Sequence, residues 1–233
     1  MRVGRRLAVK LLNSGRFILN LPEDGPDAGG LAEPLDRAML AGLDAVVAEA
    51  TEALEASDWT AALERVERFF WSFCDDYLEL VKDRAYRPVG EPAGRAARVA
   101  LRAALDVQLR LLAPYLPYAC EEVWSWWRDG SVHLAPWPEP AAGAVAADRR
   151  PLEAASVVIA ALRRAKSQAR LPLRTPVARA EVSGPPSWLD AVRVAETDLA
   201  AAGRVAAFGY RERPDAGGLD VRVELAPAEE ATT

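Results

Sequence analysis

A run of cations, one amide and one aromatic ring recurs at helical spacing near the amino terminus. Residues 1–22 contain five basic residues and no acidic residue. At about 100° per residue, one side of a helix collects the following set: Arg2, Arg6, Lys10, Asn13 and Phe17. Cations bind phosphates, an amide bonds to a base edge, and a ring stacks on a base face. The nearly opposite side collects the apolar residues Val3, Leu7, Leu11 and Ile18. The segment therefore predicts a helix, residues 3–19, with one apolar side and a stripe that can contact a nucleic acid.

Charge is distributed unevenly along the chain. The net charge is −5, from 34 acidic and 29 basic residues, which argues against a general polyanion binder. Residues 154–180, however, contain six basic residues and no acidic residue. Such segregation suits a protein that contacts an anionic partner at a defined place and repels it elsewhere. The alternative, for each basic segment, is a solvated helix face without a ligand.

No group of residues has the types and spacing that catalysis needs. The single histidine, His133, lies in an expected loop without a nearby nucleophile. The acidic pairs at 75–76 and 121–122 fall on expected helices, where neighbours point about 100° apart and form no acid–base dyad. The sequence holds no glycine-rich phosphate loop and no zinc spacing. We therefore expect no catalytic activity, no metal site and no cofactor in this chain.

Cysteine usage and hydropathy indicate the cellular setting. Cys74 and Cys120 both fall within helical patterns, so no disulfide framework is expected, and a reducing compartment fits. The basic amino terminus leads into an amphipathic helix rather than a signal peptide. No apolar run approaches the roughly 20 residues that a membrane-spanning helix needs. We expect a cytoplasmic protein without a membrane partner.

Periodicity predicts several further elements. Helices are expected at residues 34–57, 95–113, 118–128, 152–169 and 188–201. Another helix follows an N-cap at Ser57 or Asp58. Its apolar stripe, which we assign to the core, comprises Val66, Phe70, Phe73, Tyr77 and Leu80. Short strands are expected at 177–182, 205–210 and 219–225, with a hairpin turn at 215–218.

The residue pattern of the chain changes after the prolines between residues 136 and 140, from helical periods to a mixture of helical and strand-like segments. We expect a helical bundle at 1–140, a small α+β domain at 150–226 and a disordered tail at 227–233. The predicted fold class is mainly α: a helical bundle followed by a small α+β appendage with about three short strands.

Five segments resemble, in order, the anticodon-binding helical bundle of valyl-tRNA synthetases. Residues 10–17 read K-L-L-N-S-G-R-F and are similar to the family's K-L-x-N-x-x-[RK]-F. Residues 70–82 contain F-C-D-D-Y-L-E-L-V-K and resemble F-C-D-x-Y-L-E-x-x-K. Residues 112–124 resemble L-A-P-[FY]-x-P-[FY]-x-x-E-E-[VI]-W. Residues 35–40 and 161–167 resemble the start of the family's second helix and its R-x-A-K-S helix. Together these segments cover nearly the whole chain and favour the valine-specific family.

The chain departs from this family in the second helix. Ala38 stands where the family has a tryptophan, and Gly42 stands where it has a basic residue. Losing a buried tryptophan costs about 3–5 kcal/mol unless neighbours refill the space, and glycine within a helix costs about 1 kcal/mol relative to alanine. The H-I-G-H-like and K-M-S-K-S-like catalytic signatures of these synthetases are missing from the sequence. A gene fragment, an expressed domain and a free-standing homologue therefore all remain open.

The resemblance implies a function in tRNA recognition. It implies that this chain binds the anticodon arm of a tRNA, specifically the tRNA for valine. A separate catalytic domain, in cis or in trans, would then activate valine with ATP, and this chain alone would be no enzyme. The alternative is a divergent free-standing homologue that acts as an RNA-binding factor or as a protein-interaction scaffold.

On this hypothesis the cationic stripe faces a ribonucleotide loop. The expected phosphate ligands are Arg2, Arg6 and Lys10. Asn13 is expected to reach a base edge, and Arg16 or Phe17 to supply a stacking plane. Two further sets complete the prediction: Lys82, Arg84 and Tyr86 as a second wall, and Arg163, Arg164 and Lys166 along the outer side of the stem. Asn13 has an alternative role in capping or bridging the first two helices, and Phe17 an alternative role in packing.

Overall fold

The computed structural model describes residues 2–24, 33–140 and 148–226, with the backbone alone at Arg2 and Val3. Two compact units make up the chain. The first, here called the bundle, comprises Met1–Leu78 and Arg84–Asp148, and the C-terminal unit comprises Glu79–Asp83 and Arg149–Thr233. No helix within the described ranges is long and apolar enough to cross a membrane. The tail predicted at 227–233 lies outside the described residues.

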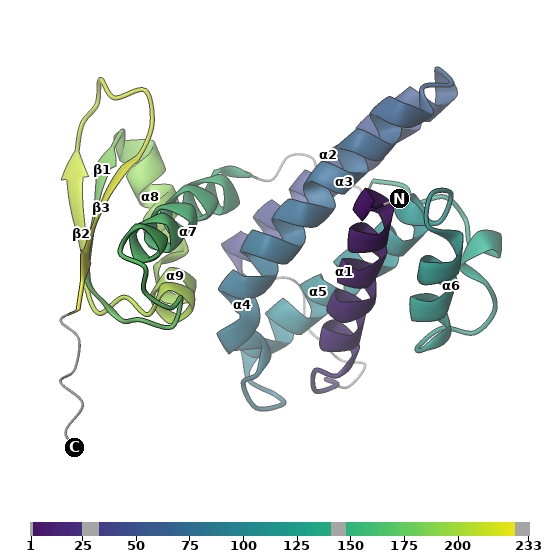
Figure 1. The fold of residues 1–233 in the computed structure, drawn as a ribbon, viewed down its shortest axis with the longest axis horizontal. Coiled ribbons are helices and arrows are strands. Elements are labelled where there is room, and N and C mark those ends of the chain that lie inside the picture. The colour runs from purple at the N-terminus through teal and green to yellow at the C-terminus, as the bar shows by residue number, and fades with distance from the viewer. Residues whose placement is uncertain (1, 25–32, 141–147, 227–233) are drawn as a thin grey trace. The chain divides into compact units, whose positions relative to one another are not determined.

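The bundle is built from helices (Figure 1). Its elements are α1 (Arg2–Leu19), α2 (Pro34–Glu55), α3 (Trp59–Ser72), the π-helical turn η1 (Phe73–Tyr77), α4 (Leu78–Ala85), α5 (Pro92–Leu112), α6 (Pro117–Ser125) and the 3-10 turn η2 (Val132–Leu134). The middle of α4, Glu79–Asp83, is counted with the C-terminal unit. α2 packs along α3, α5 contacts both α1 and α2, and α6 packs on α1. The predicted mainly helical class is confirmed.

Prolines and one aspartate start these helices. Pro34, Pro92 and Pro117 stand in the first turns of α2, α5 and α6, where a backbone N–H has no partner within the helix anyway. Asp58 caps α3, since its side chain accepts a hydrogen bond from the Ala61 N–H at 2.9 Å. The predicted N-cap at this boundary is confirmed.

The aromatic stripe predicted for the third helix lies in the core. Its five members, Val66, Phe70, Phe73, Tyr77 and Leu80, are all buried. The helix is not continuous, however, because the π-helical turn separates α3 from α4. Such a turn adds one residue to the helical period. Phe73, Cys74 and Tyr77 are buried within this turn.

A buried ion pair ties the start of α2 to the end of α4. The Arg84 guanidinium donates to both carboxylate oxygens of Asp36, with Nη2–Oδ1 at 2.7 Å and Nη1–Oδ2 at 3.0 Å. The Tyr77 hydroxyl donates to the same carboxylate at 2.8 Å, and Arg84 Nη1 also donates to the carbonyl of Ala93. Because these groups satisfy each other, two opposite charges can remain inside the bundle.

A second arginine fixes the chain that follows α1. Arg98 of α5 is 1% exposed and donates to Asp24 through Nε at 2.6 Å and Nη2 at 2.8 Å. Its Nη1 donates to the carbonyls of Ala85 and Arg87. The hydrogen bond from Arg98 holds the pKa of Asp24 below its usual value, so the pair stays charged. This contact anchors the segment after α1 to α5.

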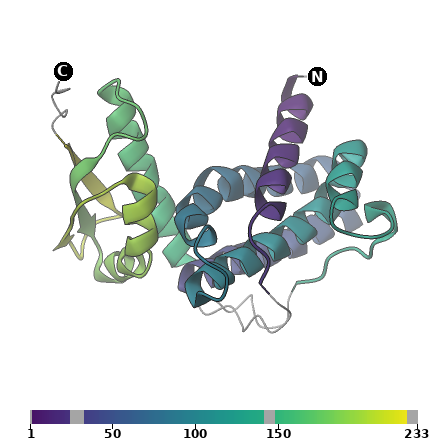
Figure 2. The same ribbon diagram turned by 90° about the horizontal axis from the view of Figure 1, so that it is seen from below.

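The C-terminal unit is a three-stranded sheet with helices on one face (Figures 1 and 2). Its elements are α7 (Arg150–Gln168), β1 (Val177–Gly184), α8 (Pro186–Val194), α9 (Glu196–Gly203), β2 (Phe208–Glu212) and β3 (Asp220–Leu225). The strand order is β2-β1-β3, with β1 parallel to β2 and antiparallel to β3. The predicted small α+β appendage is confirmed.

The hairpin predicted at residues 215–218 is wrong, because β2 and β3 pair with opposite edges of β1. The central strand must be buried, and β1 alone of these three strands has fully buried residues, among them Ala180 and Val182. The connection from β2 to β3 instead crosses the end of β1 at Gly184. A Cβ there would lie 3.0 Å from the Gly218 carbonyl oxygen, so glycine permits the crossing.

The helix predicted at 188–201 is two helices, because the chain leaves helical geometry at Ala195. This residue has φ −99° and ψ 5° and serves as the C-cap of α8 and the N-cap of α9. Two acidic residues, Glu196 and Asp198, then stand in the first turn of α9. Negative charge there is favourable beside the free N–H groups of a new helix.

The buried ion pair yields a stability prediction. Arg84→Met keeps the apolar stem but leaves the Asp36 carboxylate buried without its cation. Breaking such a pair from one side costs about 3–5 kcal/mol. We expect urea unfolding to show this loss, whereas Lys82→Met, at an exposed ion pair with Glu79 on the same helix, should change stability by less than about 1 kcal/mol. Equal effects of the two changes would contradict a structural role for Arg84.

Candidate nucleic-acid interface

The apolar side of α1 is packed into the bundle, as predicted. Leu7, Leu11 and Ile18 are at most 3% exposed. α6 approaches α1 closely at Gly15, where a Cβ would lie 2.6 Å from Val123 Cγ1. Glycine is therefore required at this crossing, since any side chain would push the helices apart. The packing turns the opposite side of α1 outward.

That outward side is here called the α1 ridge, and it comprises Arg6, Lys10, Asn13, Arg16 and Phe17. Arg6, Asn13 and Arg16 are exposed, and Lys10 and Phe17 are half-buried. The Asn13 side chain makes no hydrogen bond to any part of the chain that the structure describes, and its mid-helix position excludes a capping role. Arg2 begins the same helix, but its side chain lies outside the described atoms.

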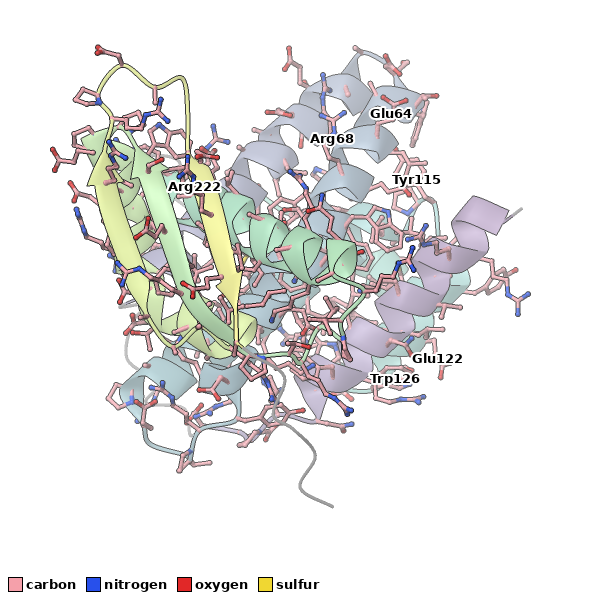
Figure 3. All side chains as sticks on the ribbon, turned by 60° about the vertical axis from the view of Figure 1, so that its left-hand side comes forward. Glu64, Arg68, Tyr115, Glu122, Trp126 and Arg222 are labelled. Atoms are coloured by element: carbon pink, nitrogen blue, oxygen red, sulfur yellow. The ribbon has the colours of Figure 1, made fainter. Side chains whose placement is uncertain are left out.

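Two tryptophans hold the ridge arginines. The Arg6 guanidinium lies over the Trp71 ring of α3 at 4.9 Å from the ring centroid. Arg16 lies over the Trp126 ring, at the end of α6, at 5.7 Å (Figure 3). Each indole N–H donates to a glutamate one turn earlier, which fixes the ring. A stacked guanidinium keeps its N–H edge open, and neither arginine has a carboxylate partner within the described ranges.

The lysine of the ridge is already paired. Lys10 Nζ lies 2.8 Å from Asp75 Oδ1, and the two side chains are 35% and 53% exposed. An exposed pair of this kind is worth about 0–1 kcal/mol, so an anion can displace the carboxylate. Lys10 is therefore not a free cation, as the sequence suggested, but one that Asp75 screens.

The aromatic ring of the ridge packs on a second predicted residue. The rings of Phe17 and Tyr86 meet edge to face with centroids 5.8 Å apart. Tyr86 is 60% exposed, whereas Phe17 is half-buried beneath it. Phe17 therefore packs on Tyr86, and the exposed ring at this place is that of Tyr86.

Two predicted cations are buried and must be corrected. Arg84 is engaged by Asp36 inside the bundle and presents no guanidinium edge to solvent. Lys166 is 2% exposed and donates to the carbonyls of Leu173 at 2.9 Å and Gly203 at 2.8 Å. Burial, together with the charge of Arg204, lowers the pKa of Lys166. Neither residue can serve as a surface phosphate ligand in this fold.

The remaining predicted cations stay near the surface. Lys82 is partly exposed, and its Nζ lies 3.5 Å from Glu79 Oε1. On α7, Arg164 is exposed and Arg163 is half-buried. The candidate interface also includes three residues that sequence reasoning did not identify: Trp71, Asp75 and Trp126. Their contacts join segments far apart in the chain, which a helical period within one segment cannot report.

Groups suited to covalent or metal chemistry are buried or scattered. Cys74 and Cys120 are free and buried, and burial raises the pKa of each thiol to about 12. His133 is exposed, with Nε2 3.3 Å from the Pro117 carbonyl oxygen. No group of three or more metal-ligating side chains occurs among residues 2–24, 33–140 and 148–226. The α1 ridge is therefore the candidate site that the geometry supports.

Comparison with known proteins relates this chain to part of tRNA ligases. A family model described as the anticodon-binding domain of tRNA ligase matches residues 36–182. The chain is 51% identical over 234 residues to valine–tRNA ligase of Thermobifida fusca, covering 98% of this chain and 26% of that protein. It is 49% identical over 201 residues to valine–tRNA ligase of Cutibacterium acnes, covering 85% of this chain and 23% of that protein.

The chain thus spans about a quarter of the length of the curated relatives it matches. Among solved structures, it is similar to one chain of a ternary complex of LeuRS, tRNA and LeuAMS from Agrobacterium radiobacter K84. The TM-score is 0.41 at 23% identity, over 62% of this chain and 16% of that chain. α1 precedes the part matched by the family model.

The pairing of Lys10 with Asp75 yields a prediction. Asp75→Asn should tighten binding of polyuridylate by up to about fivefold, because an exposed ion pair of at most about 1 kcal/mol no longer competes. Fluorescence anisotropy at 50 mM salt measures the change. Glu55→Gln, which removes an exposed charge at the end of α2, should leave the affinity within twofold of the parent. Equal gains from both variants would show that only net charge matters.

Proposed function

This chain belongs to the anticodon-binding domain family of tRNA ligases, and we propose that it binds the anticodon arm of a tRNA through the α1 ridge. The observation that carries the proposal is the pair of guanidinium groups, Arg6 and Arg16, held on tryptophan rings with their N–H edges open. Asn13 stands exposed between them. A chain with net charge −5 thus concentrates oriented cations along one helix.

The ridge offers the groups that an unstacked RNA loop needs. From Arg6 to Arg16 it extends about 15 Å, at about 1.5 Å per residue, which is long enough for several nucleotides. Arg6 and Arg16 bind phosphates, and Lys10 joins them when an RNA phosphate replaces Asp75. Asn13 bonds to a base edge, and the exposed ring of Tyr86 provides the stacking plane first assigned to Arg16 or Phe17.

The partner proposed for this interface is the tRNA for valine, since the relatives that align over most of this chain are named valine–tRNA ligases. Valine activation with ATP would belong to a separate catalytic domain, in cis or in trans, and this chain would bind no cofactor itself. Arg2 and Arg164 remain proposed as further phosphate ligands. The setting proposed for this activity is the cytoplasm.

The departures in the second helix do not favour a protein-binding scaffold. Ala38 is buried, and a Cβ at Gly42 would lie 3.4 Å from Phe69 Cε2. Phe69 of α3 therefore occupies the space beside Gly42, and the change is absorbed where α2 packs on α3. Neither departure alters the residues of the α1 ridge.

Charge reversal on the ridge tests the proposal. Arg6→Glu combined with Lys10→Glu should weaken binding of valine tRNA. The plot of log affinity against log salt should also become less steep, its slope falling in magnitude by about two, because each lost phosphate contact reduces it by about one. Filter binding between 50 and 200 mM salt gives the slope. The charge-preserving pair R6K/K10R should retain it. An unchanged slope in the reversed variant would exclude the α1 ridge as the interface.

A second prediction concerns catalysis. The chain alone should show no valine-dependent exchange of pyrophosphate into ATP above background, because no described side chains form an activating site and the catalytic signatures are missing from its sequence. The full-length Thermobifida enzyme is the positive control. Exchange by the chain alone, at a rate that scales with its concentration, would contradict the assignment.

A further inference from the structure

The sheet of the C-terminal unit has one uncovered face. Helices α7, α8 and α9 lie on the other face, and no described element covers this one (Figures 1 and 2). Along β1 the alternation is clear: Ala180 and Val182 are buried toward the helices, while Arg179 and Glu181 are exposed. The uncovered face, here called the open sheet face, is therefore polar and accessible.

Arginines from two strands surround a hollow on this face. Its volume is about 280 Å³, and its lining comprises Glu181, Ser183, Arg211, Arg213, Asp220 and Arg222. Ser183 of β1 stands at the centre, paired in register with Arg211 of β2 and Asp220 of β3. Arg222 is two residues from Asp220 on the same strand and is paired in register with Glu181 (Figure 3).

The charges that line the hollow do not cancel, because three arginines face two carboxylates. Arg179 Nε lies 3.1 Å from Glu181 Oε1, so these two neutralise each other. Gly209 lies beside this pair, and a Cβ there would lie 2.7 Å from Arg179 Nη2. The three arginines of the hollow have no hydrogen-bonded or ion-paired side-chain partner in the described part of the chain: Arg211, Arg213 and Arg222. The carboxylates of the lining are Glu181, which is paired with Arg179, and Asp220.

The open sheet face lacks rings that could stack on bases. The aromatic residues of β2 are Phe208 and Tyr210, which are paired in register with the buried Ala180 and Val182 and so lie on the helical side. The Tyr210 hydroxyl donates to Glu196 of α9, and Arg193 of α8 lies over its ring at 4.7 Å. Sheets that read RNA sequence use aromatic side chains for this purpose. This one offers guanidinium forks, which match phosphate oxygens.

From this geometry we propose that the open sheet face is a second RNA-binding surface, which holds the phosphodiester backbone through Arg211, Arg213 and Arg222 and reads no bases. The inference rests on the proposed function in one respect, namely that the polyanion is the tRNA that the α1 ridge binds. Ser183 adds a hydroxyl donor at the centre of the hollow. Asp220 limits the affinity and so opposes indiscriminate binding of anions.

Neutralisation of two arginines tests the proposal in the full chain. R211Q/R222Q should weaken tRNA binding and lower the salt slope by about two, with the same fold loss on polyadenylate and polyuridylate. R211K/R222K preserves the charge and should keep the slope. Asp220→Asn should tighten binding, because it removes one of the two carboxylates that line the hollow. Unchanged binding in R211Q/R222Q, or a loss confined to one homopolymer, would overturn the proposal.

Two further arms separate the possible failures. Calorimetry with inorganic pyrophosphate tests whether the hollow is instead a small-anion site: pyrophosphate binding that R211Q/R222Q abolishes, with tRNA affinity unaffected, overturns an RNA surface. R6E/K10E is measured in parallel. If it weakens tRNA binding and R211Q/R222Q does not, the open sheet face alone is excluded. If the parent chain binds no tRNA, both proposals fail.

Discussion

Burial of Leu7, Leu11 and Ile18 fixes the rotation of α1 about its axis, and the whole candidate interface depends on that rotation. Each of these side chains gains about 1.5–3 kcal/mol on burial. Turning the helix by one residue would lose most of that gain and press Arg6 or Lys10 into the core. Gly15 adds a steric constraint, because only glycine allows α6 to approach this closely. The apolar side of α1 thereby determines where its cations point.

The basic residues divide according to what surrounds them. Arg84 and Arg98 are buried against carboxylates, and Lys166 is buried against carbonyls, so these three hold segments of the fold together. Arg6 and Arg16 lie on tryptophan rings at the surface and keep open donors. The first group would leave uncompensated charge if mutated. The second group is set up to bind an anion at little cost in side-chain freedom.

The sequence was sufficient wherever the signal is local. The apolar period of α1, the N-cap at Asp58 and the buried aromatic stripe of the third helix were all predicted from neighbouring residues. The sequence was insufficient where contacts between distant segments determine the structure. The turn signal at 215–218 reports a reversal of the chain but not which strand occupies the centre of the sheet.

The buried cations show the same limit of prediction from the sequence. Lys166 stands four residues after the buried Leu162, a spacing that places both on the same side of α7. It was nevertheless predicted as a surface cation, because the carbonyls that accept its hydrogen bonds come from later segments. Arg84 needs Asp36, 48 residues away. The tryptophans that orient Arg6 and Arg16 were visible as residues, but their contacts form only when the helices pack. A side chain's role therefore followed from its position only where its partners were within one or two turns.

Lysine footprinting tests the central claim most directly, because only three of the 29 basic residues are lysines. Acylation followed by mass spectrometry should modify Lys10 and Lys82 and leave the buried Lys166 untouched. On adding valine tRNA, the account predicts that Lys10 becomes protected, because an RNA phosphate replaces Asp75 beside it. Undiminished acylation of Lys10 at saturating tRNA would contradict it.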